Sequence, residues 1–416
     1  MTNKNIFTEK FLFILLSVLP IGLLVSSGVA ESIVITISAL FLLECFYKKD
    51  FSFIKNKYFI LLLMFWCSLI INQFFSKNSD LSFYRNITFV KYIIFVFAIN
   101  TILKKEEYRN LIFKIWLYTV IIVTLDIYFE YIFGHNVIGL KSIDPTRIAS
   151  FLGKELKIAH FVLGFSFIVL GFCLEKYNNS IKKKYYIFLI FFLFFTSILL
   201  TGERANSLKF VLVTILFIAL SRNKIFKSKI LILSFIFFLP YCTYIISERI
   251  KLRVDTILIP ISNKGIFETF KETQHGAHAY TAINIFKNYP MFGIGNKNFR
   301  EECFKENYQD NSYARIKERC STHPHQIYYE LLSEHGLTGT LILTVVIIIN
   351  LYKSFLIYKK YYGMVHLASI LFVFSTFLPF IPSGSFFVNW NATIFWLNFG
   401  IMLFYNNNSS NKLYKN

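Results

Sequence analysis

The sequence is poor in charged residues, and this scarcity excludes the commonest classes of protein. Only 16% of its 416 residues are Asp, Glu, Lys or Arg, whereas soluble globular domains contain about 25%. An ordinary cytosolic enzyme is therefore not expected. The sequence also lacks a Walker-type phosphate loop, a dinucleotide-binding glycine fingerprint and a serine nucleophile elbow. None of the functions tied to those three motifs is indicated.

Apolar and basic residues are abundant. The chain is 55% hydrophobic and 19% aromatic, which excludes disorder because disordered chains are poor in such residues. The formal net charge is +20, a value that could indicate a nucleic-acid partner. Here the basic residues accompany long apolar runs, so membrane lipids are the expected partner and nucleic acid is not.

Apolar stretches of about 20 residues recur along the chain, which is the length that a helix needs to cross a bilayer. The predicted fold is all-α, a polytopic membrane protein with about twelve transmembrane helices. The second, seventh, eighth and twelfth predicted spans are short enough to be tilted or half-buried. The predicted spans are 10–29, 31–47, 58–75, 84–103, 110–133, 158–175, 185–201, 207–221, 230–247, 337–354, 364–382 and 390–405.

The distribution of Lys and Arg predicts the orientation of these spans. Basic residues cluster in 48–57, 104–109, 176–184, 222–229 and 353–360, whereas loops 30–33 and 383–389 contain none. Because Lys and Arg mark the cytoplasmic side, both termini are predicted to be cytoplasmic. The first apolar run ends without a small-residue cleavage site, so it is interpreted as a retained helix rather than a signal peptide.

One connection is too long to be a simple loop. Residues 248–336 contain no long apolar run, and a structureless loop of that length is improbable, so this segment should have its own fold and function. Gly265–Asn288 is predicted to form one amphipathic helix that ends before Pro290, and a second helix should run from about His325 to Gly336. The predicted division is 1–133, N-terminal transmembrane helices; 134–157, a periplasmic loop; 158–247, transmembrane helices; 248–336, the large periplasmic loop; 337–405, C-terminal transmembrane helices; and 406–416, a disordered cytoplasmic tail.

Two of the six cysteines lie in the long outer loop. Cys303 and Cys320 would meet an oxidising compartment there, and they are predicted to form a disulfide just before His323 and His325. Two free thiols are the alternative. The other four cysteines lie in predicted spans, where a free thiol behaves as a small apolar group.

Basic residues on the predicted outer side run against the usual charge bias. Arg204 follows Thr201 in a short polar break between two spans, while Arg147, Lys154 and Lys157 lie in the loop 134–157 and Arg85 lies at another outer boundary. Each could extend to lipid headgroups without further function. Their position instead favours an anionic ligand, because a guanidinium group can bind phosphate oxygens in bidentate fashion.

A histidine-rich segment supplies a candidate base. In Thr322-His323-Pro324-His325-Gln326, the imidazole of His325 could accept a proton from a hydroxyl group just above the membrane. A capping or packing histidine is the plain alternative. His275 and His278 lie in the same loop and could indicate zinc, but zinc motifs show tighter Cys/His spacing. No metal and no cofactor is therefore predicted.

These motifs resemble those of the O-antigen ligase and O-antigen polymerase family. His325-Gln326, followed nine residues later by Gly336-x-x-Gly339, resembles the histidine signature of the ligases. The turn Pro290-Met291-Phe292-Gly293-Ile294-Gly295 is similar to the P-x-x-G-x-G turn of the same domain. Thr201–Leu208 resembles its T-x-x-R-x-x-x-L segment, with Glu203 as a departure where small or polar residues are usual.

The resemblance implies a GT-C type membrane glycosyltransferase of lipopolysaccharide biosynthesis in the bacterial inner membrane. The donor would be a glycan on undecaprenyl pyrophosphate, and the acceptor would be lipid A–core or another lipid-linked glycan. Reaction at the periplasmic face would be inverting and independent of metal. His325 would act as base and Arg204 would stabilise the leaving group, while Arg147, Arg85, Gln326, His323 and Lys154 would bind substrate.

Two alternatives remain open at this point. The glutamine after the histidine and the Gly-x-x-Gly spacing favour a ligase over a polymerase, although the two share this domain. A transporter of lipid-linked glycans or solutes belongs to a different class. Transporters show corresponding halves with charges near the midplane, whereas the polar candidates here gather on one face and in one loop.

Overall fold

The structure is a computed structural model that describes residues 2–177, 181–222 and 229–408. Its described residues form helices, turns and loops and contain no strand, so the predicted all-α class is confirmed. The helices are α1 (Thr2–Val25), α2 (Ser27–Lys48), α3 (Lys57–Phe74), α4 (Ser79–Thr88), α5 (Val90–Leu103), α6 (Glu106–Phe133), α7 (Ile158–Lys176), α8 (Ile181–Leu200), α9 (Arg204–Leu220), α10 (Lys229–Ile246), α11 (Glu248–Lys264), α12 (Ile266–Lys271), α13 (Gln274–Asn288), α14 (Phe299–Glu302), α15 (Ile327–Tyr361), α16 (Met364–Thr376) and α17 (Asn389–Asn407).

Several helices are suited to a membrane. Within the described residues, six are long and apolar enough to cross a bilayer: Ser27–Lys48, Lys57–Phe74, Ser79–Leu103, Glu106–Phe133, Ile158–Lys176 and Ile327–Tyr361. Shorter apolar helices occur at Tyr185–Leu200, Ser234–Ile246 and Met364–Thr376. The second span, expected to be short, is a helix of 22 residues. The total of about twelve spans and the periplasmic position of the long loop stay predictions.

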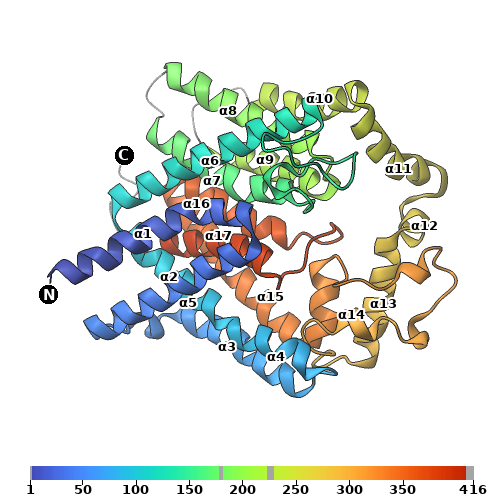
Figure 1. Ribbon diagram of the computed structural model, residues 1–416, viewed down its shortest axis with the longest axis horizontal. Helices are drawn as coiled ribbons and strands as arrows, with labels where there is room; N and C mark the ends of the chain where they lie inside the picture. The colour runs from blue at the N-terminus through green and yellow to red at the C-terminus, as the bar shows by residue number, and fades with distance from the viewer. Residues whose placement is uncertain (1, 178–180, 223–228, 409–416) are drawn as a thin grey trace.

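The core lies around α7, α16 and α17, which are buried along nearly their whole lengths. α17 packs against α5 and α16, and α16 packs against α7. These helices are apolar on all sides because no face meets the exterior. Figure 1 shows α8, α9 and α10 on one side of α16 and α17 and α3 and α4 on the other, with a smaller unit made by α13 and α14 at the edge of the molecule.

The long connection is helical, but its helices differ from the prediction. Gly265–Asn288 is two helices, α12 and α13, rather than one. Thr273 ends the continuity because its hydroxyl accepts a hydrogen bond from the backbone N–H of Gly276, at 3.0 Å, and so caps a new helix. No helix was predicted at Glu248–Lys264, where α11 leads from α10 toward α12 and α13 (Figure 1).

Some predictions fall outside the described part of the chain. α17 continues to Asn407, so the predicted tail begins later than residue 406. Residues 409–416 of that tail, and residues 178–180 and 223–228 of two predicted cytoplasmic segments, are outside the described residues.

Two glycine-containing segments meet backbone to backbone where α15 changes direction. Gly336 has φ of 61° and breaks the helical conformation within α15. Next to it lies the 290–295 turn: Leu337 N–H donates to the carbonyl of Pro290 at 2.7 Å, and Ile294 N–H donates to the carbonyl of Ser333 at 3.0 Å. The two motifs noted in the sequence therefore form one joint, which fixes the helical segment after His325 against the transmembrane part of α15.

Gly336→Ala should loosen this joint. A Cβ atom on Gly336 would lie 2.5 Å from the backbone of Met291, and the positive φ would strain the alanine. We expect the free energy of unfolding to fall by about 2–5 kcal/mol, as the sum of left-handed strain and overpacking. Thermal unfolding of the detergent-solubilised protein measures it. Gly134→Ala, at φ of 76° with no atom within 4 Å, carries the strain alone and should lose about 1–2 kcal/mol. Equal losses in the two variants would contradict the packing argument.

Candidate active site

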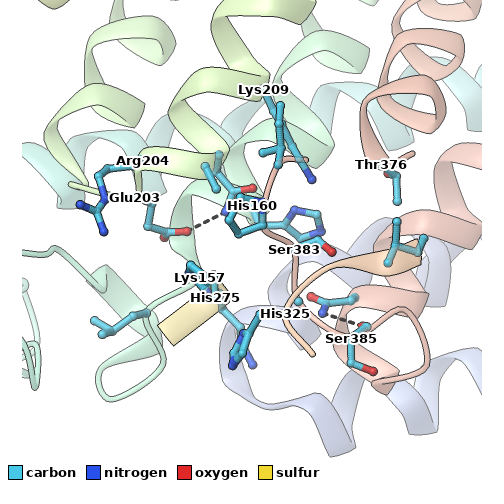
Figure 2. Close-up of a pocket in the computed structure, with 18 of the residues that line it drawn as sticks. Lys157, His160, Glu203, Arg204, Lys209, His275, His325, Thr376, Ser383 and Ser385 are labelled. Carbon is cyan, nitrogen blue, oxygen red and sulfur yellow. Dashed lines mark hydrogen bonds between the residues drawn. The ribbon is translucent and has the colours of Figure 1, made fainter. Parts of the chain in front are cut away.

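A cavity of about 590 Å³ lies where the loop before α7, the start of α9, α11, α13 and the segment before α15 converge. Its described lining contains five basic side chains and one carboxylate, so the cavity is strongly positive. Figure 2 shows Arg204 and Glu203 at the start of α9, with His275 and His325 side by side. The charged lining residues are Arg147, Lys157, Arg204, Lys209, Arg253 and Glu203.

Three arginines meet at the turn before α9. Gly202 has φ of 70°, and a Cβ atom there would lie 2.7 Å from the carbonyl oxygen of Thr146, so only glycine fits. Arg253 Nε donates to the Gly202 carbonyl at 2.8 Å, and Arg204 Nη1 donates to the Arg253 carbonyl at 2.9 Å. These bonds join α11 to the turn and hold both guanidinium groups at the cavity.

The positive charges at this turn are incompletely compensated. Burial, followed by the charges of Arg204 and Arg147, lowers the pKa of Arg253 from its usual value. Asp144 Oδ2 lies 3.3 Å from Arg253 Nη1 and offsets part of this repulsion. A bound anion would offset the remaining repulsion between the guanidinium groups, since an opposite charge favours the protonated guanidinium form.

Glu203, the departure noted in the sequence, binds groups other than the neighbouring Arg204. Its buried carboxylate accepts the backbone N–H of Ala159 at 2.9 Å, near the start of α7, and the side-chain N–H of Asn206 at 2.7 Å. Its ionic contact is with Arg147, at 3.9 Å. Glu203 therefore stabilises the N-terminus of α7, where a negative charge is favourable, while Arg204 is directed to α11.

His325 occupies a constrained position just before α15. Its φ is 56°, a conformation that few non-glycine residues adopt. The backbone N–H of Ser383 donates to its carbonyl at 2.8 Å, and its Nε2 lies 3.0 Å from Ser321 Oγ. Gln326 follows as the N-cap of α15, with its side-chain oxygen accepting from the backbone N–H of Tyr328 at 2.8 Å. The helix start thus fixes the imidazole.

Three other histidines surround His325. The ring centroid of His325 lies 4.2 Å from that of His323, 5.2 Å from His278 and 5.6 Å from His275. Burial lowers the pKa of His325, and burial together with the charge of His325 lowers that of His275 and of His278 to about 4. These imidazoles are therefore neutral near pH 7 and able to accept protons.

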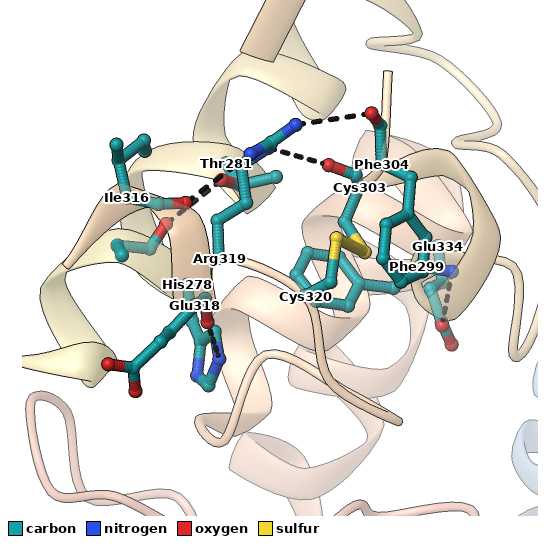
Figure 3. Close-up of a disulfide and its surroundings, with 11 residues drawn as sticks. His278, Thr281, Phe299, Cys303, Phe304, Ile316, Glu318, Arg319, Cys320 and Glu334 are labelled. Carbon is teal, nitrogen blue, oxygen red and sulfur yellow. Dashed lines mark hydrogen bonds between the residues drawn. A yellow bond between two sulfur atoms is a disulfide. The ribbon is translucent and has the colours of Figure 1, made fainter. Parts of the chain in front are cut away.

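The disulfide between Cys303 and Cys320 ties this segment to the end of α14 (Figure 3). Arg319 Nε donates to the carbonyl of Cys303 at 2.9 Å, and His278 Nε2 lies 3.1 Å from the carbonyl of Glu318. Because the two sulfurs are bonded to each other, they are not available as thiolate ligands for zinc. Among the described residues, no group of three or more His, Cys, Asp or Glu is arranged to hold a metal ion.

Four of the residues expected at the site line the cavity, and three do not. His325, Arg204, Arg147 and His323 are in the lining. Gln326 is the helix cap described above. Arg85 Nη1 donates to the carbonyl of Phe387 and to Asn389 Oδ1, both at 2.6 Å, so it supports the segment 385–389 from behind. Lys154 is exposed.

Four further basic or imidazole side chains line the cavity: Arg253, Lys157, Lys209 and His275. Lys157 is one of the outer positive charges noted in the sequence, and His275 was named there only in connection with zinc, whereas Arg253 and Lys209 were not predicted at the site. Lys209 could have been predicted from the sequence, because an ionisable residue within an apolar span is a functional candidate by default. Arg253 could not have been predicted, since its partner Gly202 is 51 residues away in the sequence.

The fold and the cavity define the class: a helical membrane protein with a cationic, histidine-bearing pocket. A family model described as O-antigen ligase matches residues 189–344, so this part of the chain is similar to that family, in agreement with the resemblance of the sequence motifs. The match includes Arg204, Arg253 and His325 but not Arg147. No curated protein matches the chain. Members of the family are membrane glycosyltransferase-like enzymes that use lipid-linked glycans, and the match does not separate ligases from polymerases.

Proposed function

We propose that this protein is a ligase that transfers a glycan from undecaprenyl pyrophosphate to a hydroxyl group of lipid A–core at the periplasmic face of the bacterial inner membrane. One observation carries the proposal. His325 and three arginines, drawn from four separate segments of the chain, line the same cavity. A proton acceptor and an anion-binding group are the two things that this transfer requires.

The arginines serve the leaving group. When the bond between the sugar and the pyrophosphate breaks, its electron pair stays on the phosphate oxygen, and the negative charge there increases. The guanidinium groups of Arg204, Arg253 and Arg147 would bind those oxygens, and Lys157 at the same cavity would add a further positive charge. Stabilising charge that develops in the transition state is the largest single contribution in many enzymes.

His325 serves the acceptor. Its neutral imidazole would accept the proton as the acceptor oxygen forms the new bond to the anomeric carbon. The acceptor would attack from the side opposite to the pyrophosphate, so the anomeric configuration would invert. The histidine stays in its basic form near pH 7 because burial lowers its pKa.

A deletion strain complemented with the gene tests this function. The proposal predicts that deletion leaves bare lipid A–core and accumulates lipid-linked polymer, and that complementation restores capped lipopolysaccharide. Core with single repeat units would instead identify a polymerase and overturn the ligase assignment. Movement of labelled lipid-linked glycan across proteoliposomes without glycosyl transfer would identify a transporter and overturn the enzyme assignment.

A further inference from the structure

A second cavity, of about 510 Å³, lies at the other end of α17. Val388 and Asn391 at the start of that helix line the first cavity, whereas Asn407 and Asn408 at its end line the second. A helix of 19 residues is about 28 Å long, close to the ~30 Å thickness of a hydrocarbon core. The two cavities therefore lie about one membrane thickness apart along α17.

The second cavity has one strongly buried acidic group. Glu44 is only 7% exposed; its Oε1 pairs with Lys48, while its Oε2 is buried without a hydrogen-bond partner. Buried carboxylate oxygens are nearly always satisfied, so an unsatisfied one that lines a cavity indicates a missing donor. Asn100, also buried, lies in the same lining.

The surroundings of Glu44 favour a cation as that donor. The C-terminal ends of α2, α5 and α17 meet at this cavity, and helix C-termini carry a partial negative charge. Three phenylalanines line it as well: the ring of Phe53 lies 5.3 Å from that of Phe41 and 5.9 Å from that of Phe97. Aromatic faces attract ammonium groups.

The other charged side chains of the lining are Lys48, Asp50 and Lys104, all of them exposed. Lys48 pairs with Glu44, and Lys104 takes part in no salt bridge among the described residues, although hydrogen bonds from Ser52 and then the charge of Lys104 lower the pKa of Asp50. The cavity thus offers a carboxylate at a buried position and an ammonium group at an exposed one. A ligand with a terminal ammonium and an adjoining phosphate is complementary to both.

Apolar side chains beside the cavity indicate that this ligand carries acyl chains. Phe46 is 65% exposed and Tyr47 is 82% exposed at the end of α2, and Ile54 is exposed nearby in the short helix Ser52–Lys55. A soluble zwitterion would not need them, whereas the chains of a membrane lipid would cover them.

We propose that this cavity binds the phosphoethanolamine headgroup of a membrane phospholipid, at the boundary opposite to the active-site cavity. The ammonium group contacts Glu44 and Asn100, and the phosphate contacts Lys104. The site is separate from the proposed glycosyl transfer, and it stands whether or not that function is correct.

Lipid titration of the purified full-length protein tests the site. Phosphatidylethanolamine in detergent micelles should raise the thermal unfolding midpoint of the wild type, and native mass spectrometry should show one retained molecule. Glu44→Gln and Lys104→Gln should each lose this shift. Glu107→Gln, an exposed substitution at the start of α6, is the matched control and should retain it.

Three results would overturn the proposal. An equal shift with phosphatidylglycerol would mean that any phospholipid is sufficient. An equal shift with free phosphoethanolamine would mean that the ligand is a soluble zwitterion. Retention of the shift in both Glu44→Gln and Lys104→Gln would exclude this cavity as the site. If Glu44→Gln does not fold, because the pair with Lys48 is lost, Lys104→Gln decides alone.

Discussion

His325→Asn is expected to lower the rate of glycan transfer by about 10²- to 10⁴-fold, the usual contribution of a general base. Asparagine is the informative replacement because it tolerates the left-handed conformation better than alanine, and His325 has φ of 56°. The variant should therefore keep the backbone before α15 while losing the imidazole. A loss of rate then reports chemistry rather than unfolding.

The measurement is transfer of a labelled lipid-linked glycan in membranes that contain equal amounts of each protein. His135→Asn supplies the matched control, since His135 lies in the loop before α7 and is not in the described lining of the cavity. It should keep the wild-type rate. Full activity of His325→Asn at normal expression would rule out a role for His325 as base.

The pH dependence of the wild-type transfer rate should also reveal the role of His325 as base. The reaction needs neutral His325, and burial moves its pKa below the usual value of about 6.5. The rate should stay level as pH falls from about 8 to about 6.5, and it should fall only as pH passes through the lowered pKa. A decline that begins above pH 7 would contradict a depressed pKa at this residue.

The all-α membrane fold could be predicted because its signals are local. A run of apolar residues indicates a helix wherever it packs, and the predicted span 158–175 matches α7 (Ile158–Lys176) closely. The amphipathic segment before Asn288 was harder, because a single side chain, Thr273, decides between one helix and two. Side-chain caps of this kind act over three residues and override periodicity.

Only some residues of the candidate site could be predicted from the sequence, and the reason differs from that for the fold. His325 could be found because its neighbours Gln326 and Gly336 shape the same short segment of backbone. Arg253 could not, because its place at the cavity depends on a contact with Gly202 that folding alone creates. Arg85 illustrates the converse: an outer-boundary arginine resembles a ligand-binding group in sequence, yet its guanidinium is hydrogen-bonded to Asn389.

Arg253→Lys is expected to lower glycan transfer by about 10- to 150-fold, which corresponds to the ~1.5–3 kcal/mol of a hydrogen bond to a charged group. Lysine keeps the charge but not the planar set of donors. Arg253 uses Nε on the Gly202 carbonyl at 2.8 Å and Nη1 on Thr146 Oγ1 at 3.0 Å. A single ammonium group cannot hold both partners and still present a donor to a phosphate oxygen.

Arg249→Lys is the matched control, one helical turn earlier in α11. Arg249 lies beside the ring of Tyr131, 6.0 Å from its centroid, and it is not in the described lining of the cavity. It should keep the wild-type rate. A normal rate for Arg253→Lys would show that its fork of donors is not needed.

The division of the loss between kcat and KM separates the two roles that Arg253 could have. If Arg253 acts on the charge that develops on the pyrophosphate, kcat and kcat/KM should fall together, because the interaction is made only in the transition state. If it holds only the ground-state donor, KM should rise while kcat stays constant. A parallel fall in unfolding temperature would mean that Arg253 serves mainly to hold α11 on the 201–204 turn. The contact with Gly202 makes that the strongest competing explanation, and an unchanged unfolding temperature with reduced kcat would exclude it.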